Sequence, residues 1–149
     1  MCNNSKCGGT EKTKTRYGHQ SSTGISNWGL TPTVLDEQPN KGRTIIEKLE
    51  DLADETGFAI ALLTPDDVGA SKKNRNDLKP RARQNVILEL GYFLALGRQR
   101  VCILYKEGVE LPSDIQGVVY VPMDDNGEWK QKIVREMESV GLLIDANKI

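Results

Sequence analysis

The strongest constraint on the fold of this 149-residue chain is a long apolar segment that lies between two short apolar runs. Residues 80–97, PRARQNVILELGYFLALG, read as one helix that is apolar almost all round and belongs inside a domain. Residues 58–63 (FAIALL) and 101–105 (VCILY) have strand length and lack polar positions, which is typical of strands buried on both faces. The three segments together predict buried strands covered by helices.

The segment before this unit predicts one more strand and one more helix. Residues 31–35 (TPTVL) have the composition of a short strand. Thr44 predicts a helix N-cap, because Glu47 stands three residues later and completes a capping box. Apolar residues then recur on one helical face until Gly57, which is expected to end the helix.

The segment after the unit predicts a final strand and a final helix. Residues 118–123 read as the strand, and residues 128–140 carry an apolar stripe at helical spacing, with Asp124 or Asp125 as the cap. The whole order is therefore β-α-β-α-β-β-α. This alternation predicts an α/β fold with a mostly parallel sheet flanked by helices.

Three loops follow the predicted strands and are expected at one edge of the sheet. They cover residues 36–43, 66–83 and 106–117. Ligands of such sheets bind beyond the carboxyl ends of the strands. The polar stretch 66–79 is expected to be a long irregular loop, and loops of this length are often functional.

The ends of the chain differ in composition from its middle. Residues 1–26 are rich in Gly, Ser, Thr, Asn and Lys without apolar periodicity, so we expect a disordered or irregular tail. The predicted domain covers residues 27–143, and residues 144–149 form an extension. The N-terminus has no apolar signal region, and no apolar run approaches the roughly 18 residues of a spanning helix. We therefore expect a cytoplasmic protein without a membrane partner.

Charge and cysteine content narrow the classes of partner. The formal net charge is −1, with 20 basic and 21 acidic side chains, which gives no general attraction to nucleic acid. Cys102 lies in a predicted strand, Cys2 and Cys7 lie in the tail, and His19 is the one histidine. A structural zinc site needs about four converging ligands, so neither a metal site nor a disulfide framework is expected.

Glu89 is the carboxylate in the middle of the apolar helix. At about 100° per residue it falls on the shoulder of the apolar face, near Asn85 and Phe93. A shoulder position is able to form the wall of a cleft, where partial burial raises the pKa of a carboxyl group. The alternative is a solvated glutamate or an ion pair with Arg83 or Arg98. The residues placed on the core arc are Val86, Ile87, Leu90, Phe93 and Leu94.

Three contiguous stretches resemble a known family. They are EQPNKGRTIIEKLE (37–50), GFAIALLTPDDVG (57–69) and RARQNVILELGYFLALGRQRVCILY (81–105). They are similar to the bacterial TIR-like domains that act as effectors in STING-type CBASS and Pycsar antiphage systems and are described as predicted nucleotide-binding proteins. The resemblance covers residues 28–142, and it implies the flavodoxin-like TIR fold.

The resemblance also implies an activity and its residues. Catalytic TIR domains hydrolyse NAD+ to nicotinamide and ADP-ribose forms, and Glu89 matches the catalytic glutamate of the motif in residues 85–91. Residues 37–43 match the BB loop, which borders the NAD+ pocket and takes part in self-association. The positions assigned to nucleotide binding are Arg43, Asp66, Asp67, Arg81, Arg83, Asn85 and Tyr92.

The expected chemistry needs one carboxylate and no resident cofactor. Breaking the nicotinamide–ribose bond passes through an oxocarbenium-like state, which a carboxylate stabilises or traps. NAD+ is then a substrate, and the family implies homo-oligomerisation together with a STING-like or other cyclic-nucleotide sensor domain. Tyr92 or Phe93 is able to stack on a ring, although packing is the more usual role of such residues.

The first strand and helix of the family pattern are atypical or missing here. Residues 16–30, RYGHQSSTGISNWGL, offer only a faint His-Gly loop and no apolar strand. Loss of that strand would leave unpaired strand edges, which favours a catalytically impaired module that binds a nucleotide or a protein. A nucleoside N-glycosidase is a further alternative. A nucleic-acid binder has the least support, because the basic cluster 72–75 stands alone.

Overall fold

A parallel three-stranded sheet forms the centre of the computed structural model, which describes residues 28–30, 32–34, 42, 44–53, 56–115 and 117–145. The strands are β1 (Ala59–Leu63), β4 (Val101–Tyr105) and β5 (Val119–Pro122), in the order β1-β4-β5. Both strand pairs are parallel. The predicted α/β architecture with a parallel sheet is confirmed.

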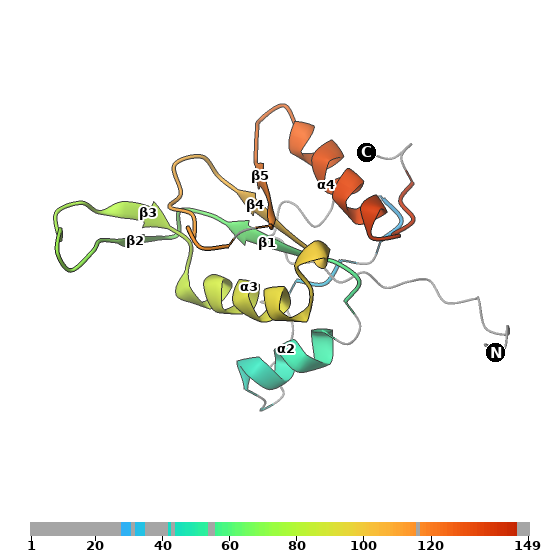
Figure 1. The fold of residues 1–149 in the computed structure, drawn as a ribbon, viewed down its shortest axis with the longest axis horizontal. Helices are drawn as coiled ribbons and strands as arrows, with labels where there is room; N and C mark the ends of the chain where they lie inside the picture. The colour runs from blue at the N-terminus through green and yellow to red at the C-terminus, as the bar shows by residue number, and fades with distance from the viewer. Residues whose placement is uncertain are drawn as a thin grey trace, which may run out of the picture.

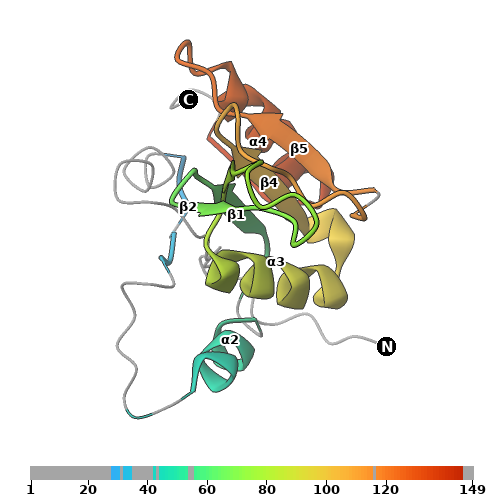
Figure 2. The same cartoon turned by 90° about the vertical axis from the view of Figure 1, so that its left-hand side faces the viewer.

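Helices cover both faces of this sheet (Figures 1 and 2). Helix α3 (Gln84–Leu96) lies on one face, with the shorter helix α2 (Ile45–Ala53) beside it. Helix α4 (Glu128–Ser139) covers the other face. A short 3-10 turn, η2 (Arg98–Arg100), connects α3 to β4. Because helices pack on both faces of the sheet, the central strands contain few polar side chains.

Two apolar cores follow from the two faces. The core under α4 contains Trp28, Leu30, Phe58, Ile60, Cys102, Leu104, Val121, Trp129, Ile133, Val134, Met137 and Leu142. The core under α3 contains Ala59, Ala61, Leu63, Ala82, Val86, Leu90, Val101, Ile103, Val109 and Val118. Alternate residues of β1 point to opposite faces, so that α4 receives Ile60, whereas α3 receives the smaller Ala59 and Ala61.

The start of α2 confirms the predicted capping box. The backbone N–H of Thr44 donates to Glu47 Oε2 at 2.7 Å, and the backbone N–H of Glu47 donates to Thr44 Oγ1 at 3.3 Å. These reciprocal bonds satisfy donors that a helix start leaves without intrahelical acceptors. The helix covers Ile45–Ala53, and positions 54 and 55, which precede the predicted end at Gly57, are not described.

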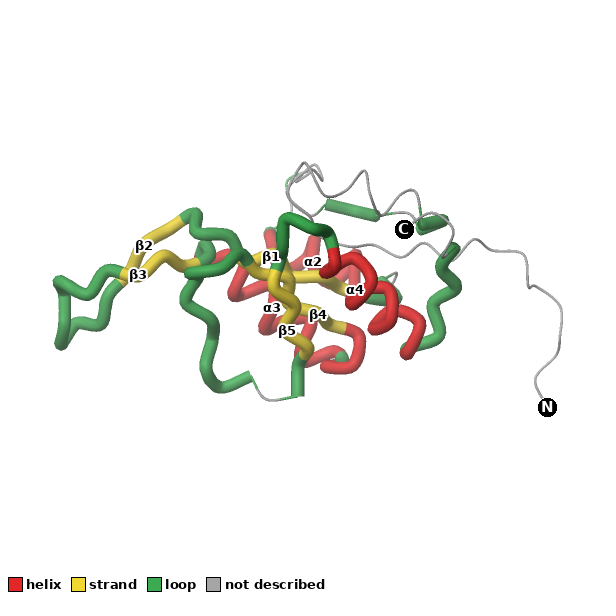
Figure 3. The backbone as a smooth tube through the Cα atoms, turned by 90° about the horizontal axis from the view of Figure 1, so that it is seen from above, coloured by secondary structure: helices red, strands yellow, loops and turns green. Residues whose placement is uncertain are grey.

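The polar stretch after β1 is a hairpin rather than an irregular loop, which corrects the prediction for residues 66–79. Strand β2 (Asp67–Gly69) pairs with β3 (Lys79–Arg81) in antiparallel register. The hairpin projects from the body of the domain (Figures 1 and 3). The prediction that the helix extends from residue 80 is therefore also wrong. Pro80 fits β3 because it lies in a two-stranded ribbon, and its carbonyl accepts from Glu110 N at 2.7 Å.

Helix α3 is buried on one face only, contrary to the expectation of an interior helix. Val86, Glu89 and Leu90 are buried. Ile87, which was placed in the core, is 37% exposed, while Leu88 is 55% and Leu96 is 58% exposed. The physical reason is that the sheet and α2 contact only part of the helix circumference. Among the described residues, no further helix or strand covers the apolar residues on its other sides.

Several predictions fall wholly or partly outside the described residues. The predicted strand 31–35 is not found in its described part, because residues 32–34 lie outside any strand, and positions 31 and 35 are not described. The tail 1–26, most of the atypical first strand and helix, and most of the loop 36–43 lie outside the described residues. These expectations remain predictions.

Candidate functional site

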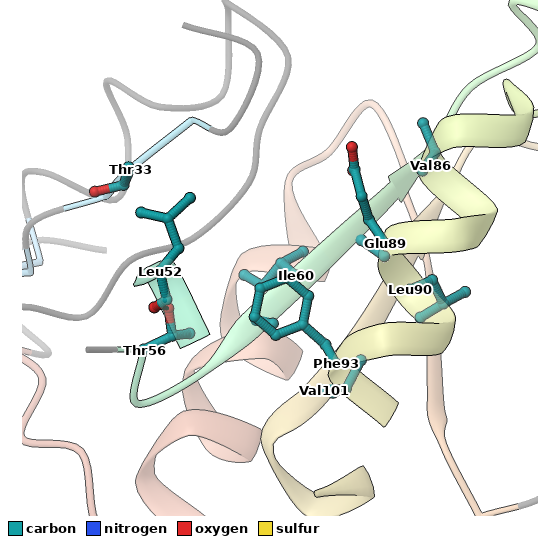
Figure 4. Close-up of a pocket in the computed structure, with 11 residues that line it drawn as sticks. Thr33, Leu52, Thr56, Ile60, Val86, Glu89, Leu90, Phe93 and Val101 are labelled. Carbon is teal, nitrogen blue, oxygen red and sulfur yellow. Dashed lines mark hydrogen bonds between the residues drawn. The ribbon is translucent and has the colours of Figure 1, made fainter. Parts of the chain in front are cut away.

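Glu89 lies in the middle of α3 and is 6% exposed. It and Lys48 are the charged or polar side chains that are buried within the described part of the chain. Its side chain projects from α3 between the positions of Val86 and Phe93, one turn to either side (Figure 4). The sequence predicted a half-open shoulder position, and the structure gives a more enclosed one.

The Glu89 carboxyl group borders a cavity of about 30 Å3 between α2, α3 and β1, which we call the Glu89 cavity. Its lining is mainly apolar. The lining residues are Thr33, Leu52, Thr56, Ala59, Ile60, Ala61, Val86, Glu89, Leu90, Phe93 and Val101. The cavity exists because β1 presents two alanines to α3, where larger side chains would fill the space between helix and strand.

The electrostatic character of the Glu89 cavity follows from this lining. Among the described residues that line it, the polar side chains besides Glu89 are the hydroxyls of Thr33 and Thr56. The Thr56 hydroxyl donates its hydrogen to the Leu52 carbonyl at 2.6 Å, so this hydrogen does not point at the cavity. A carboxylate that is shielded from bulk water attracts a positive charge more strongly than it would in solvent. The site is therefore suited to stabilising a developing cation.

The size of the Glu89 cavity limits what it holds in this conformation. A volume of about 30 Å3 is close to the volume that one molecule occupies in liquid water. Pockets for complete small ligands are on the order of 300 Å3 or more. A nucleotide ring reaches Glu89 only if the wall formed by Thr33, Leu52 and Thr56 moves away from α3.

A second cavity adjoins the first at the C-terminal end of α3. It has a volume of about 220 Å3, and we call it the Arg100 cavity. Its lining residues are Ala53, Thr56, Phe58, Ala59, Phe93, Leu96, Gly97, Arg100 and Val101. Four residues line both cavities: Thr56, Ala59, Phe93 and Val101.

The predicted acidic and basic pairs lie together, but away from the Glu89 cavity. Arg83 Nε lies 3.7 Å from Asp66 Oδ2, and Arg81 Nε lies 3.9 Å from Asp67 Oδ2. These contacts close the base of the hairpin, and none of the four residues lines the Glu89 cavity. Arg81 instead lines a separate groove of about 510 Å3 beside the first turn of α3.

The remaining predicted positions lie on other sides of α3 or are not described. Asn85 is exposed and Tyr92 is half-buried, and neither lines the Glu89 cavity. Tyr92 contacts Phe93 edge to face, with 6.0 Å between ring centroids. Phe93, which the sequence offered as an alternative to Tyr92, is the ring that lines both cavities. Arg43 is outside the described residues.

The small residues of β1 that border the Glu89 cavity are not among the site residues predicted from the sequence. Ala59 and Ala61 alternate within the run FAIALL, so a period of two places both on one face of β1. That alternation indicates that the face of β1 toward α3 carries small side chains, which leave space between strand and helix. The contribution of Thr33 had no local signal, because it comes from a separate segment that tertiary packing brings to β1, whereas Thr56 stands three residues before the strand.

The described residues include no group of three His, Cys, Asp or Glu side chains positioned to hold a metal ion. Among the helices of the described part, none is long and apolar enough to cross a bilayer.

Comparison with known proteins finds one matching family model and several relatives. The family model described as "CAP12/Pycsar effector protein, TIR domain" matches residues 13–125. Protein YuaY of Escherichia coli K12 is 45% identical over 125 residues, which cover 83% of this chain and 42% of YuaY. The Pycsar effector protein PaPycTIR of Pseudomonas aeruginosa is 44% identical over 79 residues, or 51% of this chain and 25% of that protein.

A more distant relative belongs to the same group. CD-NTase-associated protein 12 of Sphingobacterium faecium is 27% identical over 84 residues, which cover 56% of this chain and 25% of that protein. The chain thus spans between a quarter and less than half of the lengths of these three relatives.

Proposed function

Because the chain belongs to the family of CAP12/Pycsar effector TIR domains, we propose that it hydrolyses NAD+ at the nicotinamide–ribose bond, with Glu89 as the catalytic carboxylate. The observation that carries the proposal is the burial of this one carboxylate, 6% exposed, against an apolar cavity. The names of the Pycsar relatives support an effector role, and the family resemblance of the sequence implies an antiphage context for it.

The proposed reaction uses Glu89 and one water molecule. The bond between the ribose anomeric carbon and the nicotinamide nitrogen breaks, and its electron pair stays with the nitrogen. Nicotinamide leaves as a neutral molecule, so no acid group is needed to protonate it. Glu89 stabilises the positive charge that develops on the ribose, and water then attacks the anomeric carbon. The products are nicotinamide, ADP-ribose and one proton.

The small volume of the Glu89 cavity implies that activity depends on a conformational change. About 30 Å3 does not admit a nicotinamide ring, so the wall that carries Leu52 and Thr56 must separate from α3. We propose that assembly with further copies of the chain provides this opening, under the control of a cyclic-nucleotide sensor. The relatives are much longer than this chain, which leaves room in them for such a sensor.

The direct test measures nicotinamide release from NAD+ at high protein concentration. We expect release by the wild type and a loss of about 100-fold or more in Glu89→Gln. The substitution removes a preorganised negative charge that stabilises the positively charged transition state. Glu107→Gln, which changes an exposed glutamate in the loop after β4, is the matched control and should keep full activity. Equal release by Glu89→Gln and the wild type would exclude Glu89 as the catalyst.

A second candidate is a TIR-like module that binds a nucleotide or protein without turnover. The observations that favour it are the small volume at Glu89 and the exposed apolar residues Ile87, Leu88 and Leu96 on α3. Calorimetric binding of NAD+ without nicotinamide release would select this function. Release of base from free nucleosides, with NAD+ left intact, would instead select a nucleoside N-glycosidase.

A further inference from the structure

The β2–β3 hairpin carries an exposed apolar face. Val68 lies opposite Pro80 in the strand register, and Leu78 stands two residues before Pro80. Because side chains alternate between the two sides of a strand, these three residues share one face of the hairpin. Val68 is 58% exposed, Leu78 is 63% exposed, and Pro80 is also exposed. A two-stranded hairpin is only marginally stable in water unless such a face packs on another element, so this face is suited to docking.

The tip of the same hairpin is positively charged. Lys72, Lys73 and Arg75 are exposed. The nearby carboxylate of Asp77 lies 3.8 Å from Lys79 Nζ, at the base of the tip. Among the described residues, no ion pair involves the side chains of the three tip cations. A surface that covers this hairpin therefore has to combine an apolar contact with negative charge.

The outer side of α2 has that composition. Four exposed residues fall within one arc of about 140° on this helix, at about 100° per residue: Ile46, Glu47, Glu50 and Asp51. Ile46 is 54% exposed, which makes it the apolar residue among three carboxylates. The opposite side of α2 carries Leu49, which is 1% exposed. The helix is thus anchored by one side and presents an acidic side with an apolar edge.

The hairpin and the acidic side of α2 lie apart on one chain (Figures 1 and 2). The hairpin projects from the domain after β1, whereas α2 packs beside α3. A hairpin placed in this way reaches α2 of a second copy more readily than its own α2. Contact between two different surfaces of the same chain is head-to-tail, and it adds copies in a ring or a filament. Charge complementarity therefore selects a second copy as the partner.

We propose that the β2–β3 hairpin of one copy docks on the acidic side of α2 of the next copy. This inference rests on the assembly that the proposed function requires, and it names the surfaces that form it. Val68 and Leu78 contact Ile46, and the cations of the hairpin tip face Glu50 and Asp51. The inner side of α2 carries Leu52, which lines the Glu89 cavity. Docking on the outer side thus acts on the helix that has to separate from α3.

The test is a reciprocal charge reversal, measured by sedimentation velocity without NAD+. The hairpin variant carries Lys72→Glu, Lys73→Glu and Arg75→Glu, and the helix variant carries Glu50→Lys and Asp51→Lys. Each variant alone brings like charges together, so we expect its dissociation constant for self-association to rise by about 10- to 100-fold. An equimolar mixture should associate again. In the mixture the acidic hairpin meets a basic helix, and the basic hairpin meets an acidic helix.

Two further variants separate this contact from general effects of charge. A control with Arg98→Glu, Lys132→Glu and Arg135→Glu reverses three exposed cations outside the hairpin and should associate like the wild type. A variant with Val68→Ser and Leu78→Ser keeps the charge and should weaken self-association at both low and high salt. The charge contribution, in contrast, should decrease as the salt concentration rises.

Several results would overturn the inference. They are a wild type that stays monomeric up to about 1 mM, a mixture that associates no better than its components, and equal weakening in the control variant. Binding of a monomeric wild type to phosphatidylserine vesicles or to RNA, lost in the hairpin variant, would assign the hairpin to a different partner and would also overturn it.

The proposed hydrolysis is judged by a separate measurement, nicotinamide release by the wild type. Self-association through these surfaces without nicotinamide release would leave the interface in place and exclude the hydrolysis. Nicotinamide release by a protein that stays monomeric would have the opposite meaning.

Discussion

Arg83 and Asp66 face each other at the base of the β2–β3 hairpin, with Arg83 Nε 3.7 Å from Asp66 Oδ2. The neighbouring pair, Arg81 and Asp67, repeats the contact at 3.9 Å. Both pairs are substantially exposed, so each contributes little to the free energy of unfolding. These four charged residues, which the family resemblance assigns to nucleotide binding, thus lie together at the base of the hairpin.

Gly69 permits the Arg81 side chain to lie across β2. A methyl group at this position would collide with the Arg81 guanidinium. Since that group is the far end of a flexible side chain, we expect Gly69→Ala to displace Arg81 from Asp67 and to lower the free energy of unfolding by about 1 kcal/mol or less. Urea unfolding measures the change, and a crystal structure of the variant would show the displaced arginine.

Gly91→Ala is the matched control for this substitution. A methyl group at Gly91 meets no atom within 4 Å, and the residue lies inside α3. Alanine there should stabilise the protein by about 0.5–1 kcal/mol, because glycine is a poor helix former. Loss of several kcal/mol in Gly69→Ala would contradict the expected adjustment of Arg81.

The two faces of α3 should respond differently to truncation. Leu90 is 2% exposed under the sheet, whereas Leu88 is 55% exposed. We expect Leu90→Ala to lower the free energy of unfolding by about 2–5 kcal/mol, because it leaves a cavity in a packed core. Leu88→Ala should change it by about 0.5 kcal/mol or less. Similar losses in both variants would show that a partner surface covers Leu88 in solution.

Cys102 should be chemically inert in the folded protein. Burial, with a smaller contribution from the charge of Glu136, raises the pKa of its thiol from 9.0 to about 12. In a Cys2→Ser, Cys7→Ser background, we expect labelling by a disulfide reagent at pH 8 only as fast as the chain unfolds. Rapid labelling of the native protein would contradict the burial of Cys102.

The same thiol predicts a loss of stability at alkaline pH. Above pH 9 the unfolded chain releases the Cys102 proton, while the native thiol keeps it up to about pH 12. Its contribution to stability is thus complete below pH 9 and decreases as the pH rises toward 12, by up to about 1.4 kcal/mol per pH unit. Denaturant titrations between pH 8 and 11 should show a steeper decline in the parent protein than in Cys102→Ala.

Asp124 stabilises the start of α4. Its two carboxylate oxygens accept hydrogen bonds from the backbone N–H groups of Glu128 at 2.9 Å and Trp129 at 3.1 Å. Burial raises the pKa of Asp124, but these backbone hydrogen bonds outweigh it and hold the pKa below its ordinary value of 3.8. The contribution of the carboxylate is therefore present above pH 4 and is lost as the pH falls further.

This cap predicts a pH-dependent difference between two neighbouring variants. Asp124→Ala should lower the thermal midpoint at pH 7, and its difference from the wild type should shrink as the pH falls below 4. Asp125→Ala, which removes an exposed carboxylate, is the control and should leave the midpoint near that of the wild type. An equal decrease in both variants would contradict the assignment of the cap to Asp124.

The sequence by itself determined the elements whose signals are local. The run VCILY became β4 with its predicted bounds, and the apolar stripe after Asp124 became α4. The capping box of Thr44 and Glu47 formed as predicted. In each case the residues that specify the element are adjacent or one helical turn apart, so no information about distant segments was needed.

Only the tertiary structure decided which apolar residues are buried and what surrounds Glu89. The sequence of α3 is apolar on nearly all sides, but the sheet and α2 cover one side, and this leaves Leu88 and Leu96 exposed. The Glu89 cavity combines residues from α2, β1 and α3 with Thr33 from another segment. Its volume depends on how closely these segments approach, a distance that no periodicity in the sequence encodes.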